Sequence, residues 1–177
     1  MLAAHGPPVA TDDATGSVPA VGLSPDRRDA PVVPASPPAS GPRRQRVAVY
    51  GLCEDSDDRV LLVRAAPFLT VAGQWFLPGG GLDHGEDPAS GLRREFFEET
   101  GLEVDVGDLR GVLSDVFELP DGADLHTIRI IYGIRSFSGA LRDEVDGSSD
   151  VARWVPIEEA WALPLRPYVR RALSELR

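Results

Sequence analysis

The sequence contains very little cysteine, no long apolar run and too few cations to balance its anions. Cys53 is the only cysteine among 177 residues, so an intramolecular disulfide is excluded, and no Cys/His cluster indicates a structural zinc site. No stretch approaches the roughly 20 apolar residues of a membrane helix, which predicts a soluble protein. The formal charge of −10 argues against binding along a nucleic-acid backbone, because that mode depends on clustered Lys and Arg. A reducing cytoplasm fits the single cysteine.

Residues 1–42 differ in composition from the rest of the chain. They are rich in Pro, Ala, Ser and Gly and show neither the helical nor the strand period of apolar residues. This composition predicts a disordered tail, with a partner-binding or regulatory arm as the alternative. The tail has no cationic start followed by an apolar core, and its aspartates argue against a transit peptide. We therefore expect one folded domain over residues 43–177.

Strand and helix signals alternate along residues 43–177. Strands are expected at residues 47–53, 60–63, 112–119, 125–137 and 151–155. Helices are expected at residues 88–100, 156–162 and 165–176. The first two strands should form a hairpin, and the third and fourth should pair antiparallel across the turn Pro120–Gly122. This order predicts an α/β fold with a mixed sheet and helices on both faces.

Three carboxylates lie on one face of the helix expected at residues 88–100. Glu95, Glu98 and Glu99 are at positions i, i+3 and i+4, which places their Cβ atoms roughly 5–6 Å apart. Three like charges this close are unfavourable unless a cation offsets their repulsion. An all-oxygen set suits Mg²⁺ or Mn²⁺ rather than zinc, although an isolated acidic run is more often a solvated face. Upstream, the run Gly79–Gly81 permits positive φ and a close approach of backbone to a ligand.

The segment from Gly80 to Leu102 resembles the 23-residue signature of the Nudix hydrolases, G-x5-E-x7-R-E-U-x-E-E-x-G-U, where U is a bulky apolar residue. The matching residues are Gly80, Glu86, Arg94, Glu95, Phe96, Glu98, Glu99, Gly101 and Leu102. Most of these positions demand one residue type, so an accidental match is expected far less than once in about a million segments. The resemblance covers about residues 43–177 and implies the α/β/α sandwich of that family, with a mixed β-sheet.

This resemblance implies an enzyme that uses Mg²⁺ or Mn²⁺ to hydrolyse a diphosphate linkage. The expected substrate is a small nucleotide-type molecule such as a nucleoside triphosphate, ADP-ribose or a dinucleotide. The alternative is a non-catalytic relative that binds a nucleotide or a protein partner as a sensor. Such relatives commonly lose one of the glutamates, whereas this chain keeps all three. Many relatives are homodimers, so the resemblance adds a homodimer to the expectations.

The family pattern also assigns roles to individual residues of the signature. Glu95, Glu98 and Glu99 are the expected metal ligands, together with the backbone carbonyl of Gly80. Arg94 is expected to pair with Glu98 or another carboxylate and to orient it for catalysis.

The general base is open between two regions of the sequence. Glu98 in the helix is one candidate, and Glu144 in the acidic stretch 143–146 is the other, because related proteins often bring this loop to the metal. Asp150 is a further candidate of the same kind. Glu86 either supports the site or is a charge favoured by the helix dipole.

Three residues outside the signature are candidates for contact with the substrate, with packing in the core as the alternative for the two aromatic ones. Trp75 and Phe76 precede the glycine run, so one ring could stack on a base while the other is buried. Arg129, on the long strand at residues 125–137, is the third.

Overall fold

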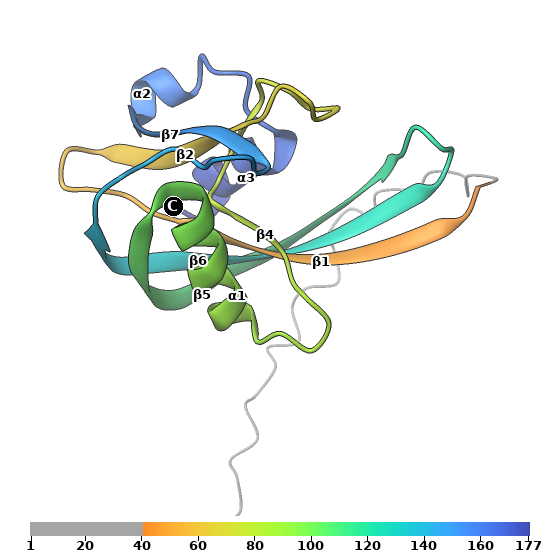
Figure 1. Cartoon of the computed structure of the whole chain (residues 1–177), viewed down its shortest axis with the longest axis horizontal. Helices are drawn as coiled ribbons and strands as arrows, with labels where there is room; N and C mark the ends of the chain where they lie inside the picture. Colours follow the sequence, from red (N-terminus) through yellow and green to blue (C-terminus); the bar gives the residue numbers. More distant parts are fainter. Residues whose placement is uncertain (1–40) are drawn as a thin grey trace, which may run out of the picture. The chain divides into compact units, whose positions relative to one another are not determined.

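Two β-sheets and three helices make up the part of the chain that the computed structural model describes, residues 41–177 (Figure 1). The elements are β1 (Arg43–Leu52), β2 (Arg59–Ala65), β3 (Trp75–Phe76), β4 (Gly79–Gly81), α1 (Pro88–Thr100), β5 (Leu102–Glu118), β6 (Asp124–Gly139), β7 (Ser149–Pro156), α2 (Ile157–Ala160) and α3 (Pro167–Glu175). The tail predicted over residues 1–42 falls outside the described residues except for the last two. None of the described helices is long and apolar enough to cross a membrane.

The first sheet is mixed, and the second is antiparallel. Strand order in the first is β4-β1-β6-β5, with β1 and β6 parallel and the other neighbours antiparallel. The second has the order β3-β2-β7. The antiparallel pairing of β5 and β6 across Pro120–Gly122 confirms that prediction, although β5 begins ten residues earlier than the pattern indicated, at Leu102 rather than Val112.

The predicted hairpin of the first two strands is wrong, because β1 and β2 belong to different sheets. Antiparallel contacts are confined to the residues beside their connecting turn, where Glu54 bridges Val60 and the Leu61 N–H donates to the Cys53 carbonyl over 2.9 Å. Both hydrogen-bonding edges of β1 are occupied, one by β4 and the other by β6. β2 therefore pairs with β3 and β7 instead.

The second half of strand β1, residues 48–52, is buried on both faces and separates two apolar cores. Ala48 and Tyr50 point into a core that includes Val169 and other residues of α3. Val49 points the opposite way, into a core that includes Leu92 and other residues of α1. This alternation follows from the two-residue period of a strand. Helices therefore cover both sides of β1, which confirms the predicted α/β/α arrangement (Figure 1).

Helix α1 has the bounds that its sequence predicts, residues 88–100. The Asp87 side chain accepts a hydrogen bond from the Ser90 N–H over 3.1 Å, and Pro88 occupies the first turn. Gly101 ends the helix with a φ of 72°, the left-handed conformation that glycine adopts most easily. Phe96 is fully buried beneath the helix. Burying Phe96 turns the glutamate face of α1 toward β4.

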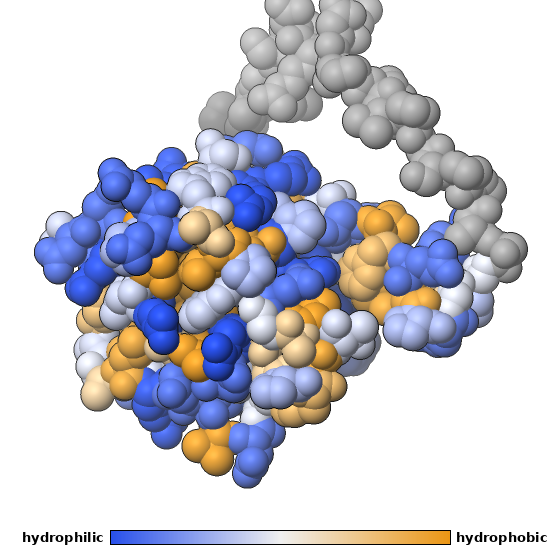
Figure 2. Space-filling model, turned by 90° about the horizontal axis from the view of Figure 1, so that it is seen from above, coloured by the Kyte–Doolittle hydropathy of each residue, from blue (hydrophilic) through white to orange (hydrophobic). Residues whose placement is uncertain are grey.

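The surface on the α2 side of the described domain mixes apolar and charged residues. Figure 2 shows apolar groups there that are separated by charged ones, the pattern of a face in contact with water. The strands β1, β5 and β6 extend beyond the helices as a three-stranded arm (Figure 1). Val112 and Val116 on the edge strand of this arm are more than half exposed.

Candidate active site

The backbone of β4 holds the innermost glutamate of α1. Glu99 is only 4% exposed, and its Oε2 accepts a hydrogen bond of 2.8 Å from the Gly79 N–H. Gly79 has a φ of 134°, and a Cβ at this position would lie 2.2 Å from the Val49 carbonyl oxygen. Only glycine fits such a conformation and such a contact. The glycine run is therefore a strand that docks against both β1 and the glutamate helix.

A second glycine of β4 faces the next carboxylate. A Cβ on Gly80 would lie 2.5 to 2.6 Å from the carboxylate atoms of Glu95, so a larger residue would displace that side chain. The Glu95 side chain is 15% exposed. Gly80 and Glu95 are thus in the close contact that the expected metal site requires.

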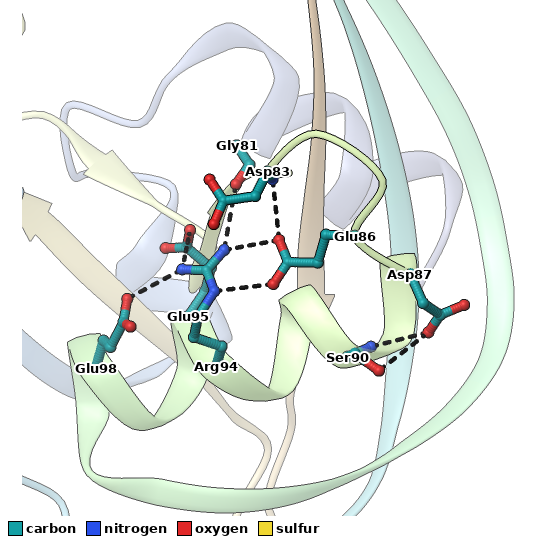
Figure 3. A network of polar contacts seen from close by, with 8 residues as sticks. All are labelled: Gly81, Asp83, Glu86, Asp87, Ser90, Arg94, Glu95 and Glu98. Atoms are coloured by element: carbon teal, nitrogen blue, oxygen red, sulfur yellow. Dashed lines mark hydrogen bonds and ion pairs between the residues drawn. The ribbon is translucent and has the colours of Figure 1, made fainter.

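Arg94 gathers the carboxylates around it in one network (Figure 3). Its Nη1 lies 3.0 Å from Glu95 Oε1 and 3.1 Å from Glu98 Oε2. Its Nε and Nη2 donate to the two oxygens of Glu86, each over 2.9 Å. Glu86 also accepts a bond from the Asp83 N–H. The expected pairing of Arg94 with Glu98 is present, and Arg94 is anchored by a bidentate bond to Glu86 that involves no expected metal ligand.

Burial perturbs the two inner glutamates. It raises the pKa of Glu95, an effect that the Arg94 guanidinium partly offsets. It raises the pKa of Glu99 well above the usual value, and the charges of Glu95 and Glu144 add to this rise. The hydrogen bond from the Gly79 N–H acts in the opposite direction. A cation beside these carboxylates would stabilise their ionised forms.

The donor atoms suit a hard divalent cation, although they do not enclose one in this arrangement. Within residues 41–177, no group of three His, Cys, Asp or Glu side chains is gathered closely enough to hold a metal ion. Arg94 holds Glu95 and Glu98, and the Gly79 N–H holds Glu99. The oxygen donors and the close contact at Gly80 fit Mg²⁺ or Mn²⁺. Binding would require Glu95 and Glu98 to turn from the guanidinium toward the ion.

The Glu86–Arg94 ion pair should make stability depend on acidity. The Arg94 guanidinium lowers the pKa of Glu86 to about 2 from 4.5. The lower value belongs to the folded state, so the stabilisation is complete above about pH 4.5 and disappears as the pH falls toward 2. We expect the urea midpoint of the wild type to fall more steeply from pH 5 to pH 3 than that of Glu86→Gln. Glu103→Gln, on the exposed side of β5, should titrate like the wild type; parallel curves for Glu86→Gln and the wild type would contradict the expectation.

Of the loop candidates for the general base, Glu144 is the one whose charge reaches the glutamate helix. Its Oε2 accepts bonds from the Ser149 N–H over 2.9 Å and from the Ser149 hydroxyl over 3.0 Å. Its charge acts on Glu99, as the raised pKa of Glu99 records. Asp150 instead forms a two-point ion pair with Arg64, with both distances 2.8 Å. This pair engages both carboxylate oxygens of Asp150.

A cluster of aromatic and arginine side chains adjoins Glu99 on the α3 side. The Arg129 guanidinium lies 4.5 Å from the Tyr168 ring centroid, and the Phe76 ring lies 6.4 Å from the same ring. Arg129 is 4% exposed and forms an ion pair with Asp115. The charge of Glu99 acts on the Tyr168 hydroxyl, so the cluster is close to the glutamate helix. The structure thus brings Phe76 and Arg129, two expected substrate contacts, together.

Trp75, the third expected contact, faces the other way. Consecutive residues of a strand point to opposite faces, so Phe76 and Trp75 diverge. Trp75 is 6% exposed, with the Arg153 guanidinium 5.8 Å from its ring centroid. It lines a cavity of about 330 Å³ between β7 and the segment after α2.

The sequence pattern did not single out three other residues of this region. Tyr168 and Asp115 belong to no motif, and Tyr168 reaches the site from a helix far along the chain. Asp115 could have been noticed, because it alternates with Leu113 and Phe117 on one face of a strand. Arg46 on β1 is the third: its guanidinium lies beside Gly81, and its charge acts on Glu95.

Known proteins are similar to this chain in sequence and in fold. Residues 42–176 match the family model described as the NUDIX domain. A MutT-like protein of Streptomyces ambofaciens is 42% identical over 138 residues, which are 78% of this chain and 81% of that protein. Diphosphoinositol polyphosphate phosphohydrolase 2 of Homo sapiens is 32% identical over 72 residues, 41% of this chain and 38% of that protein. The crystal structure of a MutT NUDIX hydrolase from Burkholderia pseudomallei is 26% identical, with a TM-score of 0.63 over 76% of this chain and 99% of that chain.

Proposed function

Because the chain belongs to the Nudix hydrolase family, we propose that it hydrolyses a diphosphate linkage in a small nucleotide-type substrate, with Mg²⁺ or Mn²⁺ as its cofactor. One observation supports this most directly. The three glutamates of α1 are all present, and β4 packs against the two inner ones through Gly79 and Gly80. Arg94 joins the third, Glu98, to the same network.

Each residue of the network has a distinct part in the proposed reaction. Glu95, Glu98, Glu99 and the Gly80 carbonyl would hold the metal ion, which supplies neutralisation of the charge on the phosphate oxygens. Arg94 keeps its two bonds to Glu86 when Glu95 and Glu98 turn away from it. It therefore remains beside the reacting group as a fixed positive charge.

Proton removal from water is assigned to Glu98. A base that takes a proton from water must be accessible to water. The Glu98 side chain is 48% exposed, more than that of Glu95 or Glu99. In the proposed step Glu98 takes a proton from water, the oxygen of that water bonds to phosphorus, and the bridging P–O bond breaks. The bridging oxygen keeps the electron pair and leaves on the second phosphate product. Glu144 is the alternative base, because its charge acts on Glu99.

Contacts with the rest of the substrate are assigned to two regions. Arg46 is proposed to bind a phosphate oxygen, because its guanidinium lies beside Gly81 of β4 and its charge acts on Glu95. Phe76 and Arg129 are proposed to bind the leaving group, because both lie against Tyr168 near Glu99.

A nucleotide-type substrate suits this chain better than a polyphosphorylated inositol. The human relative is named for diphosphoinositol polyphosphate, yet its match covers only 72 residues. A ligand with many phosphates would need many uncompensated cations, whereas this chain has a formal charge of −10 and Arg129 is paired with Asp115. The aromatic rings near Glu99 favour a planar base. We further propose a cytoplasmic location and a homodimer.

A substrate panel tests the proposed activity. Phosphate and nucleotide release would be measured with Mg²⁺ or Mn²⁺ on ADP-ribose, dinucleotide polyphosphates, NADH, nucleotide sugars and nucleoside triphosphates. We expect turnover of at least one class, which stops when EDTA removes the metal and returns when the metal is added again. Absence of metal-dependent turnover on every compound would contradict the proposal and favour a domain that only binds nucleotides.

A further inference from the structure

Two buried polar atoms beside the proposed active site lack a hydrogen-bonding partner. They are Arg129 Nε and the Tyr168 hydroxyl oxygen, on residues that are 4% and 3% exposed. An unpaired buried polar group costs about 1–3 kcal/mol, so most such groups in folded proteins have a partner. These two lie on stacked side chains, with the Arg129 guanidinium 4.5 Å from the Tyr168 ring centroid. Two adjacent unpaired groups next to a catalytic helix are the expected mark of a ligand contact.

The chemistry of the two groups selects an acceptor. Arg129 Nε can only donate a hydrogen bond. Burial raises the pKa of the Tyr168 hydroxyl well above its usual value, so this group stays protonated and can also donate. Both groups together therefore suit an oxygen with two free lone pairs, such as a carbonyl or a phosphate oxygen.

The charges around the two groups favour a neutral oxygen. Asp115 already compensates the guanidinium of Arg129, because the two form an ion pair. The charge of Glu99 also acts on Tyr168 and disfavours a second anion there. A phosphate at this position would thus meet little net positive charge. A carbonyl group meets no such cost.

The side chains around the two groups favour a flat aromatic ring. The Phe76 ring lies 6.4 Å from the Tyr168 ring, and the Arg166 guanidinium lies 5.9 Å from the centroids of both Phe76 and Phe117. Arg166 is held by one hydrogen bond of 3.2 Å to Gln74. Because Arg129 Nε and the Tyr168 hydroxyl are shielded from solvent, a ligand reaches them after a neighbouring side chain moves. A base that displaced Arg166 would lie against the Phe76 ring, which in turn lies beside the Tyr168 ring.

We propose that Arg129 Nε and the Tyr168 hydroxyl bind a ring carbonyl oxygen of the substrate's base, so that the enzyme prefers oxo bases to adenine. This inference rests on the proposed function and narrows its substrate class. Hypoxanthine and guanine carry an oxygen on C6, and the pyrimidine bases carry one on C2. Adenine carries no ring oxygen; each of its acceptor nitrogens has a single lone pair, so it can pair with only one of the two donors and would leave the other unpaired.

Binding of two monophosphates that differ at one position tests the inference independently of catalysis. Inosine monophosphate has an oxygen where adenosine monophosphate has an amino group. By calorimetry on the full chain, we expect the first to bind about tenfold more tightly, since adenine leaves one of the two buried donors unpaired. Tyr168→Phe keeps the ring and should reduce this ratio about fivefold. Arg129→Gln should reduce it further.

Tyr132→Phe is the matched control, because it removes a hydroxyl from the opposite face of β6. It should leave the ratio unchanged. Equal binding of the two monophosphates to the wild type, or a ratio that Tyr168→Phe does not change, would overturn the inference. A wild type that binds with the expected ratio but hydrolyses nothing would refute the proposed function alone. Hydrolysis of inosine and adenosine triphosphates at equal kcat/KM, with equal binding of the monophosphates, would refute only the base preference.

Discussion

Replacing Glu98 with glutamine is expected to reduce kcat on the order of 1000-fold, while the protein stays folded. Glutamine has nearly the same size but cannot take a proton from water and is a weaker ligand for a hard cation. The Glu98 side chain is 48% exposed, and its one ion pair is with Arg94. An exposed pair of this kind contributes about 0–1 kcal/mol, so the urea unfolding curve should hardly shift. The measurement is kcat on whichever compound the panel identifies, with saturating Mg²⁺ or Mn²⁺.

Two further variants are measured beside Glu98→Gln, one as a control and one to distinguish the two candidate bases. Glu103→Gln removes the same charge from an exposed site on β5 and should retain full activity. Glu144→Gln distinguishes the two candidate bases: a larger fall in kcat for Glu144→Gln than for Glu98→Gln would move the base to the loop. Wild-type kcat in Glu98→Gln would remove Glu98 from both of its proposed roles.

Local signals in the sequence predict the helix that carries the site. Asp87, Pro88 and Gly101 define the ends of α1 through bonds that lie within three or four residues of each end. The spacing of Glu95, Glu98 and Glu99 depends only on helical geometry. These features could therefore be predicted from sequence, because the physical causes of each are contained in a short segment.

The local sequence pattern does not predict which distant segments of the chain pair with one another. β1 lies parallel to β6, with Val49 opposite Ile130, and this pairing removes β1 from the hairpin that its turn suggests. A short apolar strand has the same pattern whichever neighbour it pairs with. Arg129 and Tyr168 meet for the same reason: one is on β6, the other on α3, and no spacing in the sequence links them. The substrate side of the site depends on such meetings, which is why the signature predicts the metal ligands more fully than the leaving group.

At Gly79 a local sequence signal and a long-range strand pairing act on the same residue. The sequence marks it as one of a run of glycines, but only the fold shows why glycine is needed there. β4 must lie against β1, with Gly79 opposite Tyr50, and must also direct its N–H toward Glu99. A φ of 134° achieves both. Stability and the position of a proposed metal ligand therefore depend on the same residue.

Gly79→Ala is accordingly expected to lower the free energy of unfolding by more than about 4 kcal/mol. Alanine is strained at a φ of 134°, and its Cβ would lie 2.2 Å from the Val49 carbonyl oxygen, a backbone atom that cannot rotate away. Any shift of β4 that relieves the contact also lengthens the 2.8 Å bond from the Gly79 N–H to Glu99. Equilibrium unfolding in urea, followed by circular dichroism, measures the loss.

Gly122→Ala separates the backbone conformation from the collision. Gly122 has a positive φ of 77°, but nothing lies within 4 Å of the Cβ it would gain. The left-handed conformation alone costs an alanine about 1–2 kcal/mol, so this variant should lose only that much. The difference between the two variants then measures what the approach of β4 to β1 requires. Equal losses would mean that β4 can move away from Val49 without cost, and that Glu99 does not depend on glycine at position 79.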